Sequence, residues 1–283
     1  MNTRTHFEIG MAGFRARPEG QTVSPFWPLP NDPIAVSLIA LCCVSTARGD
    51  LVEAEQWELE AIRRAEQIGF PRGPFSLAFV KTFGAWNARF LGDVEKSRRL
   101  GEEIVALGRE HGYSLWTALG SAYAPPVPTG GAEHRAFLEQ VITTVRLMGQ
   151  ESFMAAYLGY LAEMHAAAGE VPRALECVGE ALQVVEKTGE YLHLPELLRH
   201  RARYTLAAGE DSALAVADLR EAVRVARHQG ARVARLRAAV DLARALSGSE
   251  GEDWRTELAE ARKDLPPTFA SSDTMAADDL LAH

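Results

Sequence analysis

The chain has 283 residues and a formal net charge of −8, with 47% apolar and 24% charged residues. This acidic balance argues against a general nucleic-acid binder, because contact with phosphates requires a surplus of basic residues. The first residues lack the apolar core of a signal peptide, and no apolar run of about 18 residues occurs, so we expect neither secretion nor a membrane span. Since only Cys42, Cys43 and Cys177 are present, we expect no disulfide framework and a cytoplasmic location.

The two ends of the chain differ in composition from its middle. Residues 1–31 are polar, with prolines crowded around Phe26 and Trp27, and we interpret them as an arm that caps the first helices. The segment 266–283 is interpreted as a tail that caps the opposite end, with Phe269 as one of its anchors. Terminal units of helical-repeat proteins need such capping, because their outer faces have no neighbouring repeat.

Two series of glycines run through the middle of the chain at intervals of 37 to 43 residues. The first series is Gly49, Gly92, Gly130, Gly169 and Gly209, and the second is Gly69, Gly112, Gly149, Gly189 and Gly230. Glycine tolerates the positive φ angle that often follows the last turn of a helix, so each glycine predicts a helix end. The segments between them are rich in Ala, Leu, Glu and Arg, which favour helix, and they lack strand signals.

The glycines predict a repeat domain at 32–265 that consists of about six helix hairpins, each with a first helix A and a second helix B. The A helices are expected at 33–48, 75–91, 113–123, 151–168, 190–208 and 231–247, and the B helices at 51–68, 93–110, 132–148, 171–188, 212–229 and 252–264. The hairpin units are then about 33–69, 75–112, 113–149, 151–189, 190–230 and 231–264. The expected fold class is an all-α, right-handed superhelical α-solenoid, and the alternative is an irregular helical bundle.

Small residues recur at fixed distances from the first glycine series. Seven residues before the glycines lie Cys42, Ala85, Tyr123, Ala162 and Ala202, and five after them lie Ala54, Ser97, Arg135, Ala174 and either Leu214 or, with one inserted residue, Ala215. Small side chains at these points let two helices approach closely. The pattern resembles the tetratricopeptide repeat, although the unit here is longer than the ~34 residues of that repeat. The third unit fits worst, because Tyr123 and Arg135 stand in small-residue columns.

Three stretches carry a more specific resemblance. The segments Gly92–Trp116 and Leu158–Glu190, together with Asp32-Pro33 and the glycine turns that follow it, resemble the helical repeats of large bacterial regulators of the MalT-like group. Those regulators join an adenylate-cyclase or LuxR-type output to a signalling NTPase, and their repeats act as a sensor or interaction region. The likeness covers about residues 30–280, but a phosphate-binding G-x-x-x-x-G-K-[ST] motif is absent. The resemblance therefore implies the repeat scaffold and transfers no ATPase or cyclase activity.

A candidate binding surface follows from the tetratricopeptide pattern, in which the A helices line the concave groove. The residues that this register and its close neighbours single out are Phe79, Thr82, Trp86, Trp116, Tyr123, Tyr160, Glu163, Glu196, Arg199, His200 and Arg203. The groove would be aromatic toward the N-terminus and charged toward the C-terminus. Such a surface suits a protein or peptide partner, or an amphipathic small molecule. The alternative for each residue taken singly is packing in the core or, for Glu196 and Arg199, an ordinary i,i+3 pair.

A proline-rich loop at 124–131 interrupts the third unit and shortens its A helix. One interpretation is a stand-alone helical-repeat enzyme whose active-site pocket this loop opens, with His200, Glu163 and Glu196 as the catalytic candidates. The other interpretation is a loop that only shortens one repeat. We prefer a non-enzymatic scaffold that acts in regulation or signalling, and for it we assign no catalytic residue.

Other chemistry is not indicated by the remaining motifs. The histidines and cysteines do not occur at zinc-ligand spacing, so we expect no metal and no cofactor. Ten arginines lie between Arg199 and Arg244, interspersed with acidic residues. They favour a solvated face of ion pairs, with an anion or acidic-partner site as the alternative. We expect no nucleic acid and no membrane as partner, and the chain could also pair with a second copy of itself.

Overall fold

The computed structural model describes residues 12, 30–124, 131–147, 149, 153–210, 212–246 and 254–282. These residues form thirteen α-helices and one 3-10 helix, and they contain no strand. The chain groups into two compact units: the first contains α2 to α6, except for residues Ala47–Gly49, which group with the second, and the second contains α7 to α14. The predicted arm at 1–31 lies almost entirely outside the described residues.

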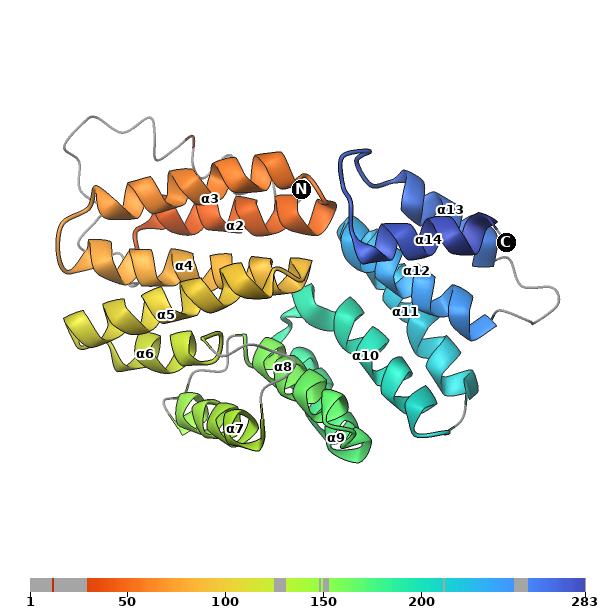
Figure 1. Cartoon of the computed structure of the whole chain (residues 1–283). Coiled ribbons are helices and arrows are strands. Elements are labelled where there is room, and N and C mark those ends of the chain that lie inside the picture. The colour runs from red at the N-terminus through yellow and green to blue at the C-terminus, as the bar shows by residue number, and fades with distance from the viewer. Residues whose placement is uncertain are drawn as a thin grey trace. The chain divides into compact units, whose positions relative to one another are not determined.

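The first unit consists of two full hairpins and one short helix, which lie side by side (Figure 1). Its helices are α2 (Pro33–Arg48), α3 (Leu51–Glu66), α4 (Arg72–Leu91), α5 (Val94–His111) and α6 (Ser114–Ser121). The short helix α6 has 8 residues where α4 has 20, as the prolines of the loop after it predict. Asp32 starts α2, because its carboxylate accepts the backbone N–H of Ala35 at 2.9 Å.

The second unit continues the alternation of A and B helices (Figure 1). Its helices are α7 (Ala132–Leu147), α8 (Met154–Ala167), α9 (Val171–Thr188), the 3-10 helix η1 (Tyr191–His193), α10 (Leu194–Ala207), α11 (Ser212–Gln229), α12 (Arg232–Leu246), α13 (Trp254–Lys263) and α14 (Ser272–Ala282). Each observed helix lies within about three residues of a predicted one, apart from α14, for which we predicted only a tail.

The glycines end the helices as predicted. Among the described residues, eight glycines have a positive φ angle, and all eight belong to the two predicted series. Gly92, Gly112 and Gly189 are the left-handed C-caps of α4, α5 and α9. Gly69 has no positive φ, and Gly130 lies outside the described residues. A repeated local signal thus produces most of the helix ends.

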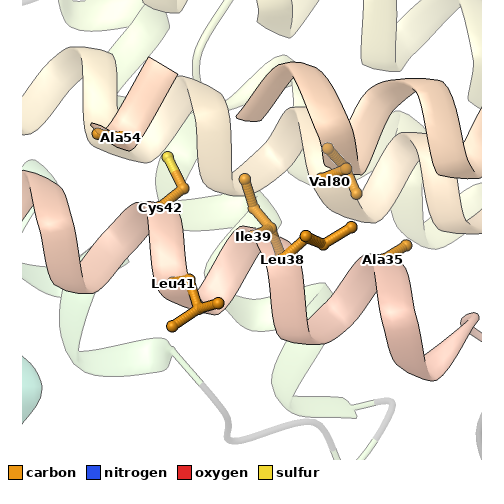
Figure 2. Packing of buried hydrophobic residues seen from close by; sticks show 8 residues of the cluster. Ala35, Leu38, Ile39, Leu41, Cys42, Ala54 and Val80 are labelled. Atoms are coloured by element: carbon orange, nitrogen blue, oxygen red, sulfur yellow. The ribbon is translucent and has the colours of Figure 1, made fainter. Parts of the chain in front are cut away.

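The small-residue columns lie in the core between A and B helices. Cys42, Ala85, Ala162 and Ala202 are each at most 2% exposed. In the first compact unit, Cys42 packs with apolar residues of α2, α3 and α4 in one cluster (Figure 2). In the fifth hairpin, Ala215 is buried, whereas Leu214 is 62% exposed. Ala215 is therefore the small residue of this hairpin, which confirms that one residue is inserted there relative to the other hairpins.

Arg135 and its partners explain why the third hairpin fits the small-residue pattern poorly. Arg135 is half-buried, and its guanidinium donates to the Glu170 carboxylate at 2.9 Å. The other oxygen of Glu170 lies 2.6 Å from Nδ1 of the buried His165. A polar contact between α7 and the α8–α9 turn therefore replaces the small-residue contact of the other units. The two helices of this hairpin, α6 and α7, also belong to different compact units.

The segment after α13 is helical rather than a loose tail. Leu265 and Phe269 are 3% and 4% exposed, and α14 follows them. Two ion pairs attach α14 to the repeat: Asp273 accepts from Arg237 at 2.9 Å, and Asp278 accepts from Arg262 at 2.9 Å. Because α14 packs on α12 and α13, it covers the last hairpin as a further A helix would.

The close packing of α5 on α6 leads to a testable prediction. A Cβ atom at Gly101 would lie 2.6 Å from the backbone nitrogen of Ala124 and 2.8 Å from the carbonyl oxygen of Gly120. Because these neighbours are backbone atoms, we expect Gly101→Ala to lower the free energy of unfolding by about 1–3 kcal/mol in urea titrations. Gly179→Ala is the matched control, since nothing lies within 4 Å of its Cβ. It should instead stabilise the helix by roughly 0.5–1 kcal/mol, and equal effects of both changes would contradict this packing.

Candidate functional site

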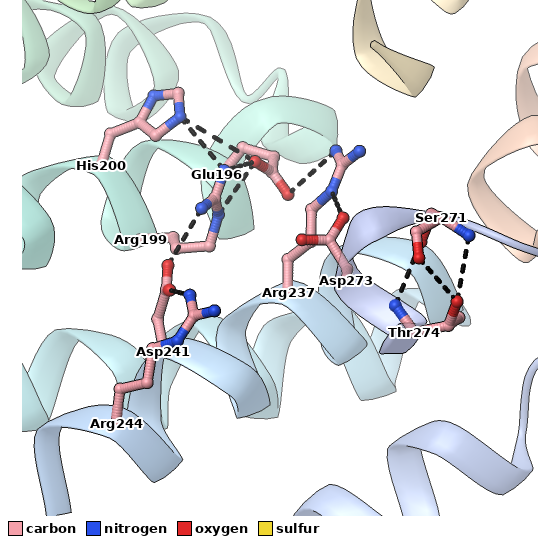
Figure 3. A network of polar contacts seen from close by, with 9 residues as sticks. All are labelled: Glu196, Arg199, His200, Arg237, Asp241, Arg244, Ser271, Asp273 and Thr274. Atoms are coloured by element: carbon pink, nitrogen blue, oxygen red, sulfur yellow. Dashed lines mark hydrogen bonds and ion pairs between the residues drawn. The ribbon is translucent and has the colours of Figure 1, made fainter. Parts of the chain in front are cut away.

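Charged side chains from three consecutive A helices meet in the second unit. We call Glu163 of α8, Glu196, Arg199 and His200 of α10, and Arg237 and Asp241 of α12 the charged cluster. In α10 the spacings of three and four residues place the side chains of Glu196, Arg199 and His200 on one face. Four of the six residues are among the predicted groove residues. Figure 3 draws the polar contacts among the members of the cluster other than Glu163.

Arg199 is the central cation of the cluster. Its Nη2 donates to Oε2 of Glu196 at 2.7 Å, and its Nη1 donates to Oδ2 of Asp241 at 3.0 Å (Figure 3). The side chains of Arg199 and Asp241 are each 12% exposed, and that of Glu196 is 19% exposed. On the other side of Glu196, Oε1 lies 3.8 Å from Nη1 of Arg237. Arg199 thus makes two largely buried ion pairs, one with Glu196 within α10 and one with Asp241 that joins α10 to α12.

His200 lies between α8 and α10 with its ring buried. Its Nε2 is 3.6 Å from Oε1 of Glu163 and 3.3 Å from Nη2 of Arg199. A guanidinium can only donate hydrogen bonds, so Nε2 acts as the acceptor and the ring proton is placed on Nδ1. This Nδ1 atom is buried and makes no hydrogen bond. The cluster therefore contains a buried donor without an acceptor.

The charges of the cluster are set by burial and by its two arginines. Burial lowers the pKa of His200 to about 4, although the carboxylate of Glu163 opposes the shift, so the ring is neutral at pH 7. Burial favours the neutral form of Glu196, but the charges of Arg199 and Arg237 outweigh it and lower the pKa to about 2. Burial also opposes the charge of Arg199, yet Glu196 and Asp241 raise its pKa.

A second buried histidine precedes α10. His193 is 9% exposed, and burial lowers its pKa to about 4, with Glu196 opposing the shift. His193 and His200 are thus both buried near Glu196. Both rings are neutral at pH 7, so neither is an imidazolium that could act as a general acid at that pH.

The two remaining predicted residues of this unit lie at different depths. Tyr160 is 9% exposed, and its ring packs edge-on against Tyr157, with 6.1 Å between the ring centroids. Arg203 is exposed, and its charge contributes to the lowered pKa of His200. Tyr160 therefore contributes to packing, whereas Arg203 is accessible to a partner.

Apart from Tyr160, the predicted aromatic residues lie in the first unit. Phe79 packs on Trp116 and Phe83, with 6.1 Å and 4.8 Å between ring centroids. Trp86 is half-buried and stacks on Phe90 at 5.8 Å. The contact between Phe79 and Trp116 joins A helices α4 and α6, whereas the other two lie within α4.

Three of the predicted anchor residues are largely buried. Trp116 and Tyr123 are each 5% exposed, and Thr82 is 8% exposed, with its hydroxyl donating to the Ala78 carbonyl at 2.8 Å. Burial leaves Phe79 and Trp86 as the more accessible of the five predicted residues of this unit. Apart from Tyr160, the predicted aromatic residues belong to the first compact unit and the predicted charged residues to the second, so a groove that contains both groups stays a prediction.

Comparison with known proteins shows similarity both in sequence and in structure. An uncharacterized protein of Rhizobium meliloti (strain 1021) is 31% identical over 150 residues, which are 52% of this chain and 15% of that protein. A Signal Transduction ATPase with Numerous Domains from Pyrococcus horikoshii, which has a tetratricopeptide repeat sensor, superimposes with a TM-score of 0.52 at 12% identity over 88% of this chain and 38% of that one. No family model matches the chain.

The fold is an all-α helical-repeat solenoid. BtubC (BKLC) from P. vanneervenii is a further structural neighbour, with a TM-score of 0.47 at 18% identity over 69% of this chain and 80% of that one. The chain spans about 15% of the length of the curated relative that it matches.

Two residues of the charged cluster were missed by the sequence analysis, namely Arg237 and Asp241. We counted inner positions backward from the first glycine series, and that series ends at Gly209, before α12 begins. A spacing of four residues between an arginine and an aspartate on an A helix was the available signal, but such pairs are common on helix surfaces. Only their contacts with residues of α10 distinguish Arg237 and Asp241 from residues on a helix surface.

Other kinds of site find little support in the part of the chain that the structure describes. There, no group of three or more His, Cys, Asp or Glu side chains is arranged to hold a metal ion. In the same part, no helix is both long enough and apolar enough to cross a bilayer. Cys42, Cys43 and Cys177 are free, and burial raises the pKa of Cys42 to about 12 and of Cys177 to about 11. Residues 125–130 of the predicted active-site loop lie outside the described residues, so the enzyme hypothesis stays a prediction.

Proposed function

We propose that this chain is a regulatory or signalling scaffold that binds a peptide or a peptide-like segment of a partner protein on the A helices of its second unit. The charged cluster is the observation that carries the proposal. Four ionised side chains, Glu196, Arg199, Arg237 and Asp241, are each less than 20% exposed there. Burying charge costs free energy that apolar side chains of similar volume would not cost, so we infer that these residues serve recognition.

The cluster provides both kinds of polar partner that the end of a peptide requires. Glu163 has a side chain that is 35% exposed, and its carboxylate can accept from an ammonium group. Nδ1 of His200 is a buried donor without an acceptor, and Arg203 offers an exposed guanidinium one turn further along α10. The ligand class that fits is a peptide with a charged end, which these side chains would orient.

The resemblances point to a sensor or interaction role. The Pyrococcus horikoshii neighbour has its tetratricopeptide repeats as a sensor in a signal-transduction ATPase. The segments that resemble the MalT-like regulators would likewise act as a sensor in this chain. Binding of a partner to the chain would then be signalled to a separate output protein. Tetratricopeptide-like repeats suit this purpose, because stacked hairpins offer an extended surface to an elongated segment.

Peptide binding measured by fluorescence polarisation tests the proposal. The probes are labelled octapeptides with one tryptophan, in four forms that have the amino terminus free or acetylated and the carboxyl terminus free or amidated. We expect the wild type to prefer a free amino terminus, and Glu163→Gln to weaken that binding about tenfold, because it removes the accessible carboxylate. Glu180→Gln is the control, since Glu180 pairs with Arg146 on the surface.

Two outcomes would contradict the proposal. One is an affinity that does not depend on the state of either terminus in the wild type. The other is an equal loss in Glu163→Gln and Glu180→Gln. The melting temperature of each variant shows whether a lost affinity reflects lost folding.

A further inference from the structure

A pocket of about 290 Å³ opens between α11, α12 and α13, and it shares no lining residue with the charged cluster. Its apolar lining includes Val223, Leu242 and Leu246, which are 5%, 6% and 7% exposed. Leu242 and Leu246 belong to the core between α10, α11 and α12, on which the half-buried Trp254 also packs. The apolar part of the pocket is therefore formed by largely buried side chains and includes one aromatic ring.

Three arginines of α11 also line the pocket. Arg220, Arg224 and Arg227 follow one another at intervals of four and three residues, which places them on one face of the helix. All three are exposed, and the side chains of Arg224 and Arg227 are 68% and 52% exposed. The pocket thus combines an apolar interior with guanidinium groups that can reach a bound molecule.

The pocket lining also includes the carboxylate of Glu257, but the acidic residues in and near the pocket do not prevent these arginines from binding an anion. Arg224 pairs with Glu221 at 2.6 Å, an exposed pair of the kind that contributes little to stability. Arg227 pairs with Glu257 and, at 3.3 Å, with Glu260.

Glu257 and Glu260 have a second partner that keeps them paired. The buried Arg235 lies 2.8 Å from Glu257 and 3.0 Å from Glu260. If Arg227 turned toward a ligand, both carboxylates would keep an ion pair, so no buried charge would be left alone. A ligand anion can therefore take the place of Glu257 and Glu260 at Arg227, and of Glu221 at Arg224.

We propose that this pocket binds a small amphipathic anion, that is, an aromatic or branched apolar body with one carboxylate, sulfonate or phosphate group. The apolar body would lie against Val223, Leu246 and the Trp254 ring. The acidic group would lie at the pocket edge, where Arg224 and Arg227 can donate to it. The volume admits one such molecule and is too small for a folded partner.

Two fluorescent probes with the same ring system test both halves of the proposal. The anionic probe is 1-anilinonaphthalene-8-sulfonate, and N-phenyl-1-naphthylamine is its uncharged counterpart. We expect the double change of Arg224→Gln and Arg227→Gln to weaken binding of the sulfonate at least fivefold, and to change the affinity for the neutral probe less than twofold. Raising the salt concentration should act in the same selective way, because it screens the guanidinium charges.

Two further variants make the test specific to the pocket. Arg173→Gln is the matched control, since Arg173 forms an exposed i,i+3 pair with Glu176, just as Arg224 does with Glu221, and it should bind both probes as the wild type does. Val223→Phe fills the pocket without changing its charge, and we expect it to abolish saturable binding of both probes.

The proposal would be overturned by any of three results. These are no saturable binding of the sulfonate by the folded wild type, an unchanged sulfonate affinity in the double arginine variant, or full binding of both probes in a folded Val223→Phe variant. Circular dichroism confirms that each variant is folded. If Val223→Phe does not fold, the arginine variants decide the matter alone.

Discussion

Replacing Arg199 by methionine is expected to lower the free energy of unfolding by about 3–5 kcal/mol, as for other broken buried ion pairs. The arginine is 12% exposed and is the cation that Glu196 and Asp241 share. Its removal leaves two largely buried carboxylates with weaker partners: Arg237 lies 3.8 Å from Glu196, and the exposed Arg244 lies 3.3 Å from Asp241. Urea unfolding followed by circular dichroism at neutral pH measures the loss.

Arg173→Met provides the matched control for this change. Arg173 and Glu176 form an i,i+3 pair, as Arg199 and Glu196 do, but both side chains are more than 60% exposed. We expect a change of at most about 1 kcal/mol, because water solvates the carboxylate that remains. If Arg199→Met cost no more than Arg173→Met, the charged cluster would not be buried in solution.

The pH dependence of the Arg199→Met effect has a definite sign. In the wild type the pKa of Glu196 is lowered from 4.5 to about 2, so its contribution to stability is present above pH 4.5 and is lost as the pH falls through 2. Without Arg199 the pKa of Glu196 rises, and protonation then relieves the buried charge at a higher pH. We therefore expect the difference between wild type and variant to shrink as the pH falls below about 4.5.

Mild acid is expected to destabilise the second unit through its two buried histidines. The pKa values of His193 and His200 are about 4 in the folded chain, against 6.5 for an unperturbed histidine. Between these two values the unfolded chain binds more protons than the folded chain. The free energy of unfolding therefore has its full value above pH 6.5. It decreases as the pH falls toward 4, by up to about 1.4 kcal/mol per pH unit for each ring.

Replacing both rings with glutamine should remove most of this slope. We expect the urea midpoint of the His193→Gln and His200→Gln double variant to change much less between about pH 6.5 and pH 5 than that of the wild type. The control is His228→Gln, because His228 is exposed on α11. A wild-type slope that persists in the double variant would show that other groups cause the acid sensitivity.

The candidate site was only partly predictable, for reasons that differ between its residues. Glu163, Glu196, Arg199 and His200 follow from counting backward along A helices, since inner positions recur with the repeat. Arg237 and Asp241 lie on α12, which has no glycine of the first series to count from. Trp116 and Tyr123 were predicted as groove residues but are 5% exposed, and the Trp116 ring packs against Phe75 and Phe79 of the preceding A helix, α4.

The sequence by itself determined the helices and their order. A glycine after each helix, small residues at the points of closest approach and strong helix formers between them are local signals, and each acts within a few turns of chain. For this reason the positive φ angles and the buried alanine columns occur where the repeat predicts them.

Only the tertiary structure decided which helices share a unit and which charges become buried. The division between α6 and α7 and the packing of α14 on α12 depend on contacts between segments far apart in the chain. The ion pair between Arg199 and Asp241, which are 42 residues apart in the chain, depends on such a contact as well. An ion pair on a helix face has the same sequence pattern whether it is solvated or buried, and only the helix that packs over it determines its energy.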